Sequence, residues 1–281
     1  MSLEPPRAAG LYRAVLSRLL ELRIPFMVGG GFAFRHYTGI ERYTKDLDIF
    51  VRPSELGEVL EKLGPVGAGS SLLYPHWLGK VYGDDAFIDV VFSSGNGVAI
   101  VDDEWLLHAH AGMVLGMPVH ICPAEETIWS KGYVAERERY DGADVAHIIR
   151  ATGPSLDWPR LLRRFGDHWR VLLSHLVLFD FIYPGEAGRI PAWVRRTFAR
   201  RLAEEWEDDG EQQSPKTCRG TLLSREQYLS DIEDEGYRDA RLVEGRMTAQ
   251  EIALWTDAIR RPEAPAAELR AGGRRGHRRG R

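Results

Sequence analysis

Three aspartates are the residues of this chain best placed for chemistry. Asp46 and Asp48 stand two residues apart in the stretch 46–51. Because side chains alternate between the two faces of a strand, both carboxylates would project to the same side. Asp89 lies in a second strand-like stretch, residues 87–92. Carboxylates gathered this closely need a cation or water between them. Two divalent cations bound by such oxygens would stabilise the attacking and leaving oxygens of a phosphoryl transfer.

A run of three glycines supplies the second part of a phosphate site. Gly29 to Gly31 follow the apolar segment 26–28, which we expect to be a buried strand, and they precede a short helical stretch. Backbone N–H groups of a glycine turn approach phosphate oxygens closely, and the next helix points its positive end to the same place. We therefore predict that Gly30 and Gly31 bind phosphate. The run does not fit the G-x-G-x-x-G dinucleotide pattern, because its last position is Phe34.

The elements that would position these residues predict an α+β fold. Apolar residues at helical spacing indicate helices, and short apolar runs that end at Gly or Pro indicate strands. The regular strand–helix alternation of a doubly wound parallel sheet is missing. We expect a mixed, mainly antiparallel sheet in a core domain of residues 1–122. The expected helices are 7–22 and 56–63, and the expected strands are 26–28, 46–51, 119–121 and the hairpin 80–92.

From residue 123 onward the pattern is helical. We predict a helical domain over residues 123–208 and a C-terminal helical extension over 209–269. The extension would contain helices at 222–242 and 248–260. The final segment, residues 270–281, carries six arginines among glycines and is predicted to be disordered. Such a tail is either a solvated terminus or a binding segment for a polyanion such as RNA.

Bulk composition is that of an ordinary globular protein, with 44% hydrophobic and 28% charged residues and a net charge of −4. The charge indicates no general nucleic-acid surface on the folded body. No apolar run is long enough for a membrane span, and no secretory signal begins the chain. Cys122 and Cys218 show no metal-binding spacing and are expected to be free thiols in a reducing compartment. These features predict a cytoplasmic protein.

Two motifs resemble those of a known superfamily. Residues 30–34, Gly-Gly-Phe-Ala-Phe, and residues 42–48, Arg-Tyr-Thr-Lys-Asp-Leu-Asp, are similar to the pattern GGxAh…RxTxDhD of polymerase-beta-like nucleotidyltransferases. The most similar groups are the toxin-like nucleotidyltransferases of abortive-infection systems and the aminoglycoside nucleotidyltransferases. A second stretch, residues 123–144, resembles the superfamily pattern PxEdhhxxK…RxKDxxDh more loosely. The resemblance covers about residues 20–150.

The resemblance implies magnesium-dependent transfer of a nucleoside monophosphate from an NTP such as ATP to an acceptor hydroxyl, with release of pyrophosphate. It implies that Asp46 and Asp48 hold two Mg²⁺ ions, and that Asp89 binds metal and helps to activate the acceptor hydroxyl. Gly31 stands where many members of the superfamily carry a serine, so one hydroxyl contact to the triphosphate would be absent.

The resemblance also assigns supporting residues around the nucleotide. Lys131 would contact the triphosphate, while Arg42 and Thr44 would support the metal-binding strand or the phosphates. Asp141 and Asp144 are accessory candidates: Asp144 would orient Lys131 or the acceptor, or simply cap and pair on its helix, and a structural role is favoured for both.

The acceptor and the partners are left open by the sequence. A small hydroxylated molecule suits the acidic body, whereas a tRNA end suits the toxin-like resemblance and would use the arginine tail. The toxin-like groups also imply an antitoxin protein as a partner. The alternative from another class is a non-catalytic nucleotide-binding or interaction module with the same fold.

Overall fold

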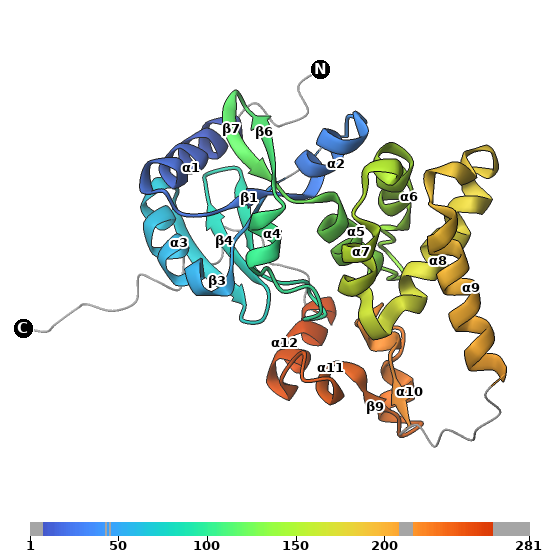
Figure 1. Cartoon of the computed structure of the whole chain (residues 1–281). Helices are drawn as coiled ribbons and strands as arrows, with labels where there is room; N and C mark the ends of the chain where they lie inside the picture. The colour runs from blue at the N-terminus through green and yellow to red at the C-terminus, as the bar shows by residue number, and fades with distance from the viewer. Residues whose placement is uncertain (1–7, 43, 45, 208–215, 261–281) are drawn as a thin grey trace, which may run out of the picture.

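The computed structural model describes residues 8–42, 44, 46–207 and 216–260 (Figure 1). The predicted arginine tail, residues 270–281, lies outside the described residues. Figure 1 shows a sheet flanked by helices α1 and α3, a group of helices from α5 to α9 beside it, and α10 to α12 (orange to red) returning to the region where the two groups meet.

One seven-stranded sheet forms the core of the first half, in the order β3-β4-β5-β2-β1-β7-β6. The β5–β2 and β1–β7 pairs are parallel and the other four neighbouring pairs are antiparallel. The prediction of a mixed, mainly antiparallel sheet in an α+β fold is therefore confirmed. The strands are β1 (Met27–Val28), β2 (Leu47–Phe50), β3 (Gly69–Tyr74), β4 (Leu78–Tyr82), β5 (Phe87–Val91), β6 (His110–Val114) and β7 (Met117–Ile121).

Helices α1 (Ala8–Leu22) and α3 (Leu56–Leu63) pack on one face of this sheet. Helix α1 buries a stripe at helical spacing that includes Tyr12, Leu16 and Leu19. The inward-facing residues of β2 meet this layer, and all of them are fully buried. Because alternate residues of a strand face opposite ways, the other residues of β2 project to the opposite face.

The opposite face of the sheet shares its hydrophobic core with the helical half. Met27 and Phe34 belong to the same buried cluster as Trp129 and Ile148. The change of architecture predicted at residue 123 therefore leaves the core continuous. The helices concerned are α2 (Gly30–Thr38), α4 (Asp103–Leu107), α5 (Ala124–Gly132), α6 (Gly142–Thr152), α7 (Trp158–Phe165), α8 (Trp169–Ile182) and α9 (Ala192–Glu207).

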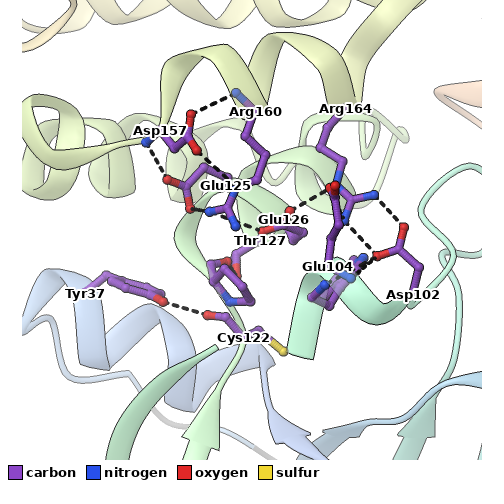
Figure 2. A network of polar contacts seen from close by, with 12 residues as sticks. Tyr37, Asp102, Glu104, Cys122, Glu125, Glu126, Thr127, Asp157, Arg160 and Arg164 are labelled. Atoms are coloured by element: carbon purple, nitrogen blue, oxygen red, sulfur yellow. Dashed lines mark hydrogen bonds and ion pairs between the residues drawn. The ribbon is translucent and has the colours of Figure 1, made fainter. Parts of the chain in front are cut away.

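Buried ion pairs hold α7 against α4 and α5 (Figure 2). Arg160 Nη2 lies 2.5 Å from Glu125 Oε2. Arg164, one turn further along α7, lies 3.0 Å from Glu126 Oε1 and 2.6 Å from Asp102 Oδ2. We call these five residues the arginine network. Arg160 and Glu126 have side chains only 4% and 0% exposed, so this part of the network is desolvated, whereas Asp102 is 45% exposed.

The C-terminal extension differs from the prediction. The single helix expected at 222–242 is wrong: the segment contains η6 (Gly220–Leu222), α10 (Leu229–Glu233), α11 (Ala240–Val243) and the short strand pair β8 (Thr217–Cys218) and β9 (Arg238–Asp239). Two local features interrupt it. Ser224 Oγ accepts hydrogen bonds from the next backbone N–H groups, and Gly236 has a positive φ of 71°. The final predicted helix is confirmed as α12 (Ala249–Arg260).

Among the described residues, none of the helices combines the length and apolar character that crossing a membrane requires.

Candidate active site

The three predicted aspartates meet at one place. Strands β2 and β5 run parallel with Asp48 opposite Asp89, so their side chains project from the same face in register. Asp46 lies one residue before β2. One carboxylate oxygen from each residue lies within 4.8 Å of the other two. We call Asp46, Asp48 and Asp89 the aspartate cluster.

The glycine turn lies directly against this cluster. Gly29 donates its N–H to the Asp48 carbonyl at 3.0 Å. Gly30 has a φ of +52°, and a Cβ there would stand 1.7 Å from Asp48 Oδ2. A Cβ at Gly31 would stand 3.2 Å from Thr44 Cβ. Only a residue without a side chain lets the backbone at position 30 approach the carboxylate so closely.

The electrostatics of the cluster favour a bound cation. Burial, and then the neighbouring charges of Asp46 and Asp89, raise the pKa of Asp48 to about 7. Asp89 Oδ1 lies 3.3 Å from the ammonium of Lys80. Within the described part of the chain, no lysine or arginine forms an ion pair with Asp46 or Asp48. Three oxygen donors at this spacing, two of them without a basic partner among the residues that the structure describes, fit a hard divalent cation such as Mg²⁺.

The side chains of Thr44 and Arg42 contact different parts of the molecule. The Thr44 hydroxyl donates to the Asp46 carbonyl at 2.9 Å and lies 3.2 Å from Asp46 Oδ1, so it fixes the turn that leads into β2. Arg42 turns toward the helical half, where it pairs with Asp144 and lies 4.1 Å above the Phe34 ring. Of the two residues, Thr44 lines the cavity described below.

Lys131 is held at the cavity wall by two carboxylates. Its Nζ lies 2.9 Å from Asp141 Oδ2 and 2.9 Å from Asp144 Oδ2. Asp141 also accepts hydrogen bonds from Arg139 at 2.8 and 3.0 Å. Burial alone would raise the pKa of Asp141, but these hydrogen bonds and the Lys131 charge outweigh it and lower that pKa to about 2. Asp141 and Asp144 therefore both hold the Lys131 ammonium at the cavity wall.

A cavity of about 530 Å³ joins these parts. Its walls come from three regions: the sheet with its glycine turn, the helical half, and the C-terminal extension. The first supplies the aspartate cluster and the second supplies Lys131 and Arg139. The volume falls in the range of pockets that take small-molecule ligands and cofactors.

Sequence reasoning missed two groups of residues at this site. Lys80 pairs with Asp89 because the two face each other across the β4–β5 hairpin, and counting outward from the predicted turn at residues 83–85 would have found it. The second group lies in the C-terminal extension, where Thr221 to Arg225 and Trp255 line the cavity. No motif signalled that group, because its place depends on how the chain folds back.

Comparisons with known proteins give a distant likeness. No protein-family model matches the chain, and no curated protein matches it. Among solved structures it is similar to the antibiotic-resistance factor ANT(2'')-Ia, with 18% identity, coverage of 72% of this chain and 96% of that one, and a TM-score of 0.35. It is also similar to the lincosamide antibiotic adenylyltransferase LnuA, with 14% identity, coverage of 49% and 94%, and a TM-score of 0.37.

A third similar structure is an antigenic nucleotidyltransferase-like protein from Paracoccidioides brasiliensis, with 14% identity, coverage of 66% of this chain and 92% of that one, and a TM-score of 0.42. Of these three structures, one is described as an adenylyltransferase and one as a nucleotidyltransferase-like protein.

Proposed function

We propose that this chain is a magnesium-dependent nucleotidyltransferase that moves a nucleoside monophosphate from an NTP to an acceptor hydroxyl and releases pyrophosphate. The proposal is carried by one observation: three carboxylates converge within 4.8 Å beside a glycine turn. The same cavity places a lysine at its wall. The carboxylates of the arginine network are paired with arginine, whereas no lysine or arginine among the described residues forms an ion pair with Asp46 or Asp48.

The roles follow from position. Asp46 and Asp48 hold Mg²⁺, which when bound neutralises phosphate charge and stabilises the attacking and leaving oxygens. Gly30 and Gly31 lie at the N-terminus of α2, where free N–H groups and the helix dipole favour an anion. Lys131 adds a point charge for the triphosphate.

The reaction balances as a single displacement. The acceptor oxygen forms a bond to the α-phosphorus of the NTP, and the bond from that phosphorus to the pyrophosphate oxygen breaks. The hydroxyl proton passes to Asp89, whose carboxylate is held by Lys80 across the hairpin.

A cytoplasmic location suits this proposed function. The reaction consumes an NTP, and both cysteines are free thiols.

The test combines purified protein, Mg²⁺ and each of the four α-³²P-labelled NTPs with two acceptor sources. One source is a low-molecular-weight filtrate of a cell extract, and the other is the RNA fraction of the same extract. We expect labelled product and released pyrophosphate from one source, both lost on chelation with EDTA and in Asp46→Asn and Asp48→Asn. Asp167→Asn, at an exposed position, is the matched control.

Two results would count against the proposal. Transfer that survives in both cluster variants would show that the metal ligands are assigned wrongly. Binding of Mg²⁺–NTP without pyrophosphate release, with either acceptor source, would favour the non-catalytic nucleotide-binding module instead.

A further inference from the structure

The C-terminal segment, defined here as residues 216–257, builds a wall of the active-site cavity. Thr221 to Arg225 and Trp255 line the same cavity as the aspartate cluster. Figure 1 shows α11 and α12 below the junction of the sheet and the helical half. A segment beyond both predicted domains therefore contributes directly to the surface that a substrate would meet.

The wall is fixed to the sheet side of the cavity. Asn96 Nδ2 donates to the Leu222 carbonyl at 2.7 Å. Gly95 approaches Trp255 so closely that a Cβ at position 95 would stand 2.8 Å from Trp255 Cζ2. A Cβ at Gly97 would likewise stand 2.5 Å from the carbonyl oxygen of Arg246. The loop after β5 and the C-terminal segment thus pack closely through both backbone and side-chain atoms.

The wall is also fixed to the helical half. Ala135 donates its N–H to the Leu223 carbonyl at 3.1 Å. Glu244 lies 3.0 Å from His168 Nε2, and the other ring nitrogen of His168 lies 2.9 Å from the Tyr133 hydroxyl. Buried Leu222 belongs to the shared hydrophobic core. Contacts to both halves make the segment a built part of the site.

The aromatic part of the wall lies on the Asp89 side of the cluster. Val91 and Ser93 follow Asp89 at alternate positions and line the cavity, at roughly 3.3 Å per residue along the strand. The Trp255 ring lies 5.1 Å from the Trp77 ring, centroid to centroid. Lys131 and Arg139 line the cavity from the helical half, where both contact Asp141. Triphosphate bound at Lys131 leaves the Asp89 side for the acceptor.

Arg225 adds a guanidinium group to this wall, and part of its hydrogen-bonding capacity is unused by the described residues. Its Cζ lies 4.4 Å above the Trp255 ring, and its Nε lies 3.3 Å from Glu136 Oε2. None of the described residues accepts a hydrogen bond from its two terminal nitrogens. Its side chain is 28% exposed, and Arg225 lines the cavity. A planar guanidinium stacked in this way presents a fork that matches a carboxylate or phosphate.

We infer that Arg225 and Trp255 determine acceptor specificity, and that the acceptor is a small hydroxylated molecule bearing a carboxylate or phosphate group. The inference rests on the proposed function. The acceptor hydroxyl lies at Asp89, the anionic group lies against Arg225, and the body of the molecule packs on Trp77 and Trp255. The cavity volume, about 530 Å³, favours a free small molecule over the end of an RNA.

The experiment separates donor binding from acceptor use. The low-molecular-weight filtrate is divided by anion exchange into neutral and anionic fractions, and transfer from α-³²P-NTP into each is measured. In parallel, the Kd of a non-hydrolysable α,β-methylene NTP with Mg²⁺ is measured by calorimetry. The variants are Arg225→Gln, Arg225→Lys, Trp255→Ala and Trp255→Phe, with Trp206→Ala, 75% exposed on α9, as the control.

We expect the wild-type protein to label the anionic fraction. Arg225→Gln and Trp255→Ala should each lower this transfer at least about tenfold while the Kd of the NTP analogue stays within about twofold. Arg225→Lys keeps the positive charge and should retain more transfer than Arg225→Gln. Trp255→Phe keeps an aromatic ring and should retain more transfer than Trp255→Ala. Gly95→Ala, which displaces the Trp255 ring rather than deleting it, is a second route to the same loss should Trp255→Ala fail to fold.

Other outcomes overturn the inference. Unchanged transfer in Arg225→Gln and Gly95→Ala would exclude a role for this wall. Equal losses of transfer and of NTP-analogue affinity would place the donor there. Labelling of the neutral fraction, or of the RNA fraction, would exclude an anionic small acceptor. If the wild-type protein neither binds the analogue nor transfers label, the proposed function itself has failed. This result is distinguishable from failure of the inference, because the inference is tested only by differences between the variants and an active wild-type protein.

Discussion

Two groups of carboxylates lie on either side of the junction between the sheet and the helices, and they are built in opposite ways. In the arginine network every carboxylate touches a guanidinium, as between Arg160 and Glu125 or Arg164 and Asp102. In the aspartate cluster only Asp89 forms an ion pair within the described residues. Burial and hydrogen bonds from Arg164 have opposing effects on Asp102, and the net result is a lowered pKa, whereas the pKa of Asp48 is raised. The carboxylates of the arginine network are thus paired with cations of the protein itself, whereas the carboxylates proposed to bind metal leave room for one.

The strongest test of this contrast is Asp48→Asn. Loss of a metal ligand should lower NMP transfer by at least about a thousandfold, since bound metal contributes several kcal/mol to the transition state. The same change removes like-charge repulsion, so the metal-free protein should melt at a higher temperature. Transfer rates and thermal unfolding of one preparation measure both. A variant that loses transfer and also melts lower would make Asp48 a structural residue.

For Arg160→Met we expect the reverse, a lower stability with unchanged transfer. Glu125 would be left buried without its guanidinium, which should lower the free energy of unfolding by about 3 kcal/mol. Urea unfolding measures the loss, and transfer per folded molecule should be unchanged. Combining Arg160→Met with Glu125→Gln should recover part of the loss, because no buried charge is then unpaired. Arg163→Met, exposed on the same helix, is the control, and an equal loss there would contradict the contrast.

Lys131 shares one property with each group. It forms an ion pair, as the residues of the arginine network do, and it lines the cavity, as the aspartate cluster does. In Lys131→Met we expect the KM for the NTP to rise about 10- to 100-fold, because a phosphate loses a charge-assisted contact. Stability should change less than in Arg160→Met, since Asp141 keeps Arg139. Steady-state kinetics at fixed acceptor concentration provide the measurement, with Lys62→Met as a control at an ion pair on the surface. An unchanged KM would assign Lys131 to the fold alone.

A further expected effect is a pH dependence of stability without metal. The pKa of Asp48 is raised from 3.8 to about 7 in the folded protein, so between these values the folded state holds a proton that the unfolded state has released. The contribution of Asp48 to the free energy of unfolding therefore falls as pH rises from about 4 to about 7 and is level above. Asp48→Asn should flatten this fall in a series of melting curves. Mg²⁺ should raise the melting temperature more at pH 8 than at pH 6.

Local spacing was enough to place Asp46 and Asp48 together and to predict the glycine turn. Asp48 lies on β2 and Asp46 one residue before it, and the parallel pairing of β2 with β5, which spacing does not report, brings Asp89 alongside. The arginine network was not predicted, because Arg160 and Arg164 contact carboxylates that are distant in sequence. The same holds for Arg225 and Trp255. Their contribution to the cavity arises from tertiary packing, which no periodic pattern reports.

The helix expected at residues 222–242 shows a second kind of limit. Apolar and charged residues in that stretch have helical spacing, but backbone hydrogen bonds to Ser224 and a left-handed turn at Gly236 divide it. Asp239 then accepts from the Arg241 N–H and begins a new short helix. Local capping outweighed periodicity there, and the broken segment is the one that can fold back around the cavity.

The contact between Gly30 and Asp48 couples two halves of the proposed reaction. With less than a methyl group of space between the Gly30 backbone and the Asp48 carboxylate, neither can shift without moving the other. If Gly30 binds phosphate and Asp48 binds metal as proposed, a change of donor or acceptor would have to leave this contact unaltered and alter the outer walls of the cavity, which include part of the C-terminal segment.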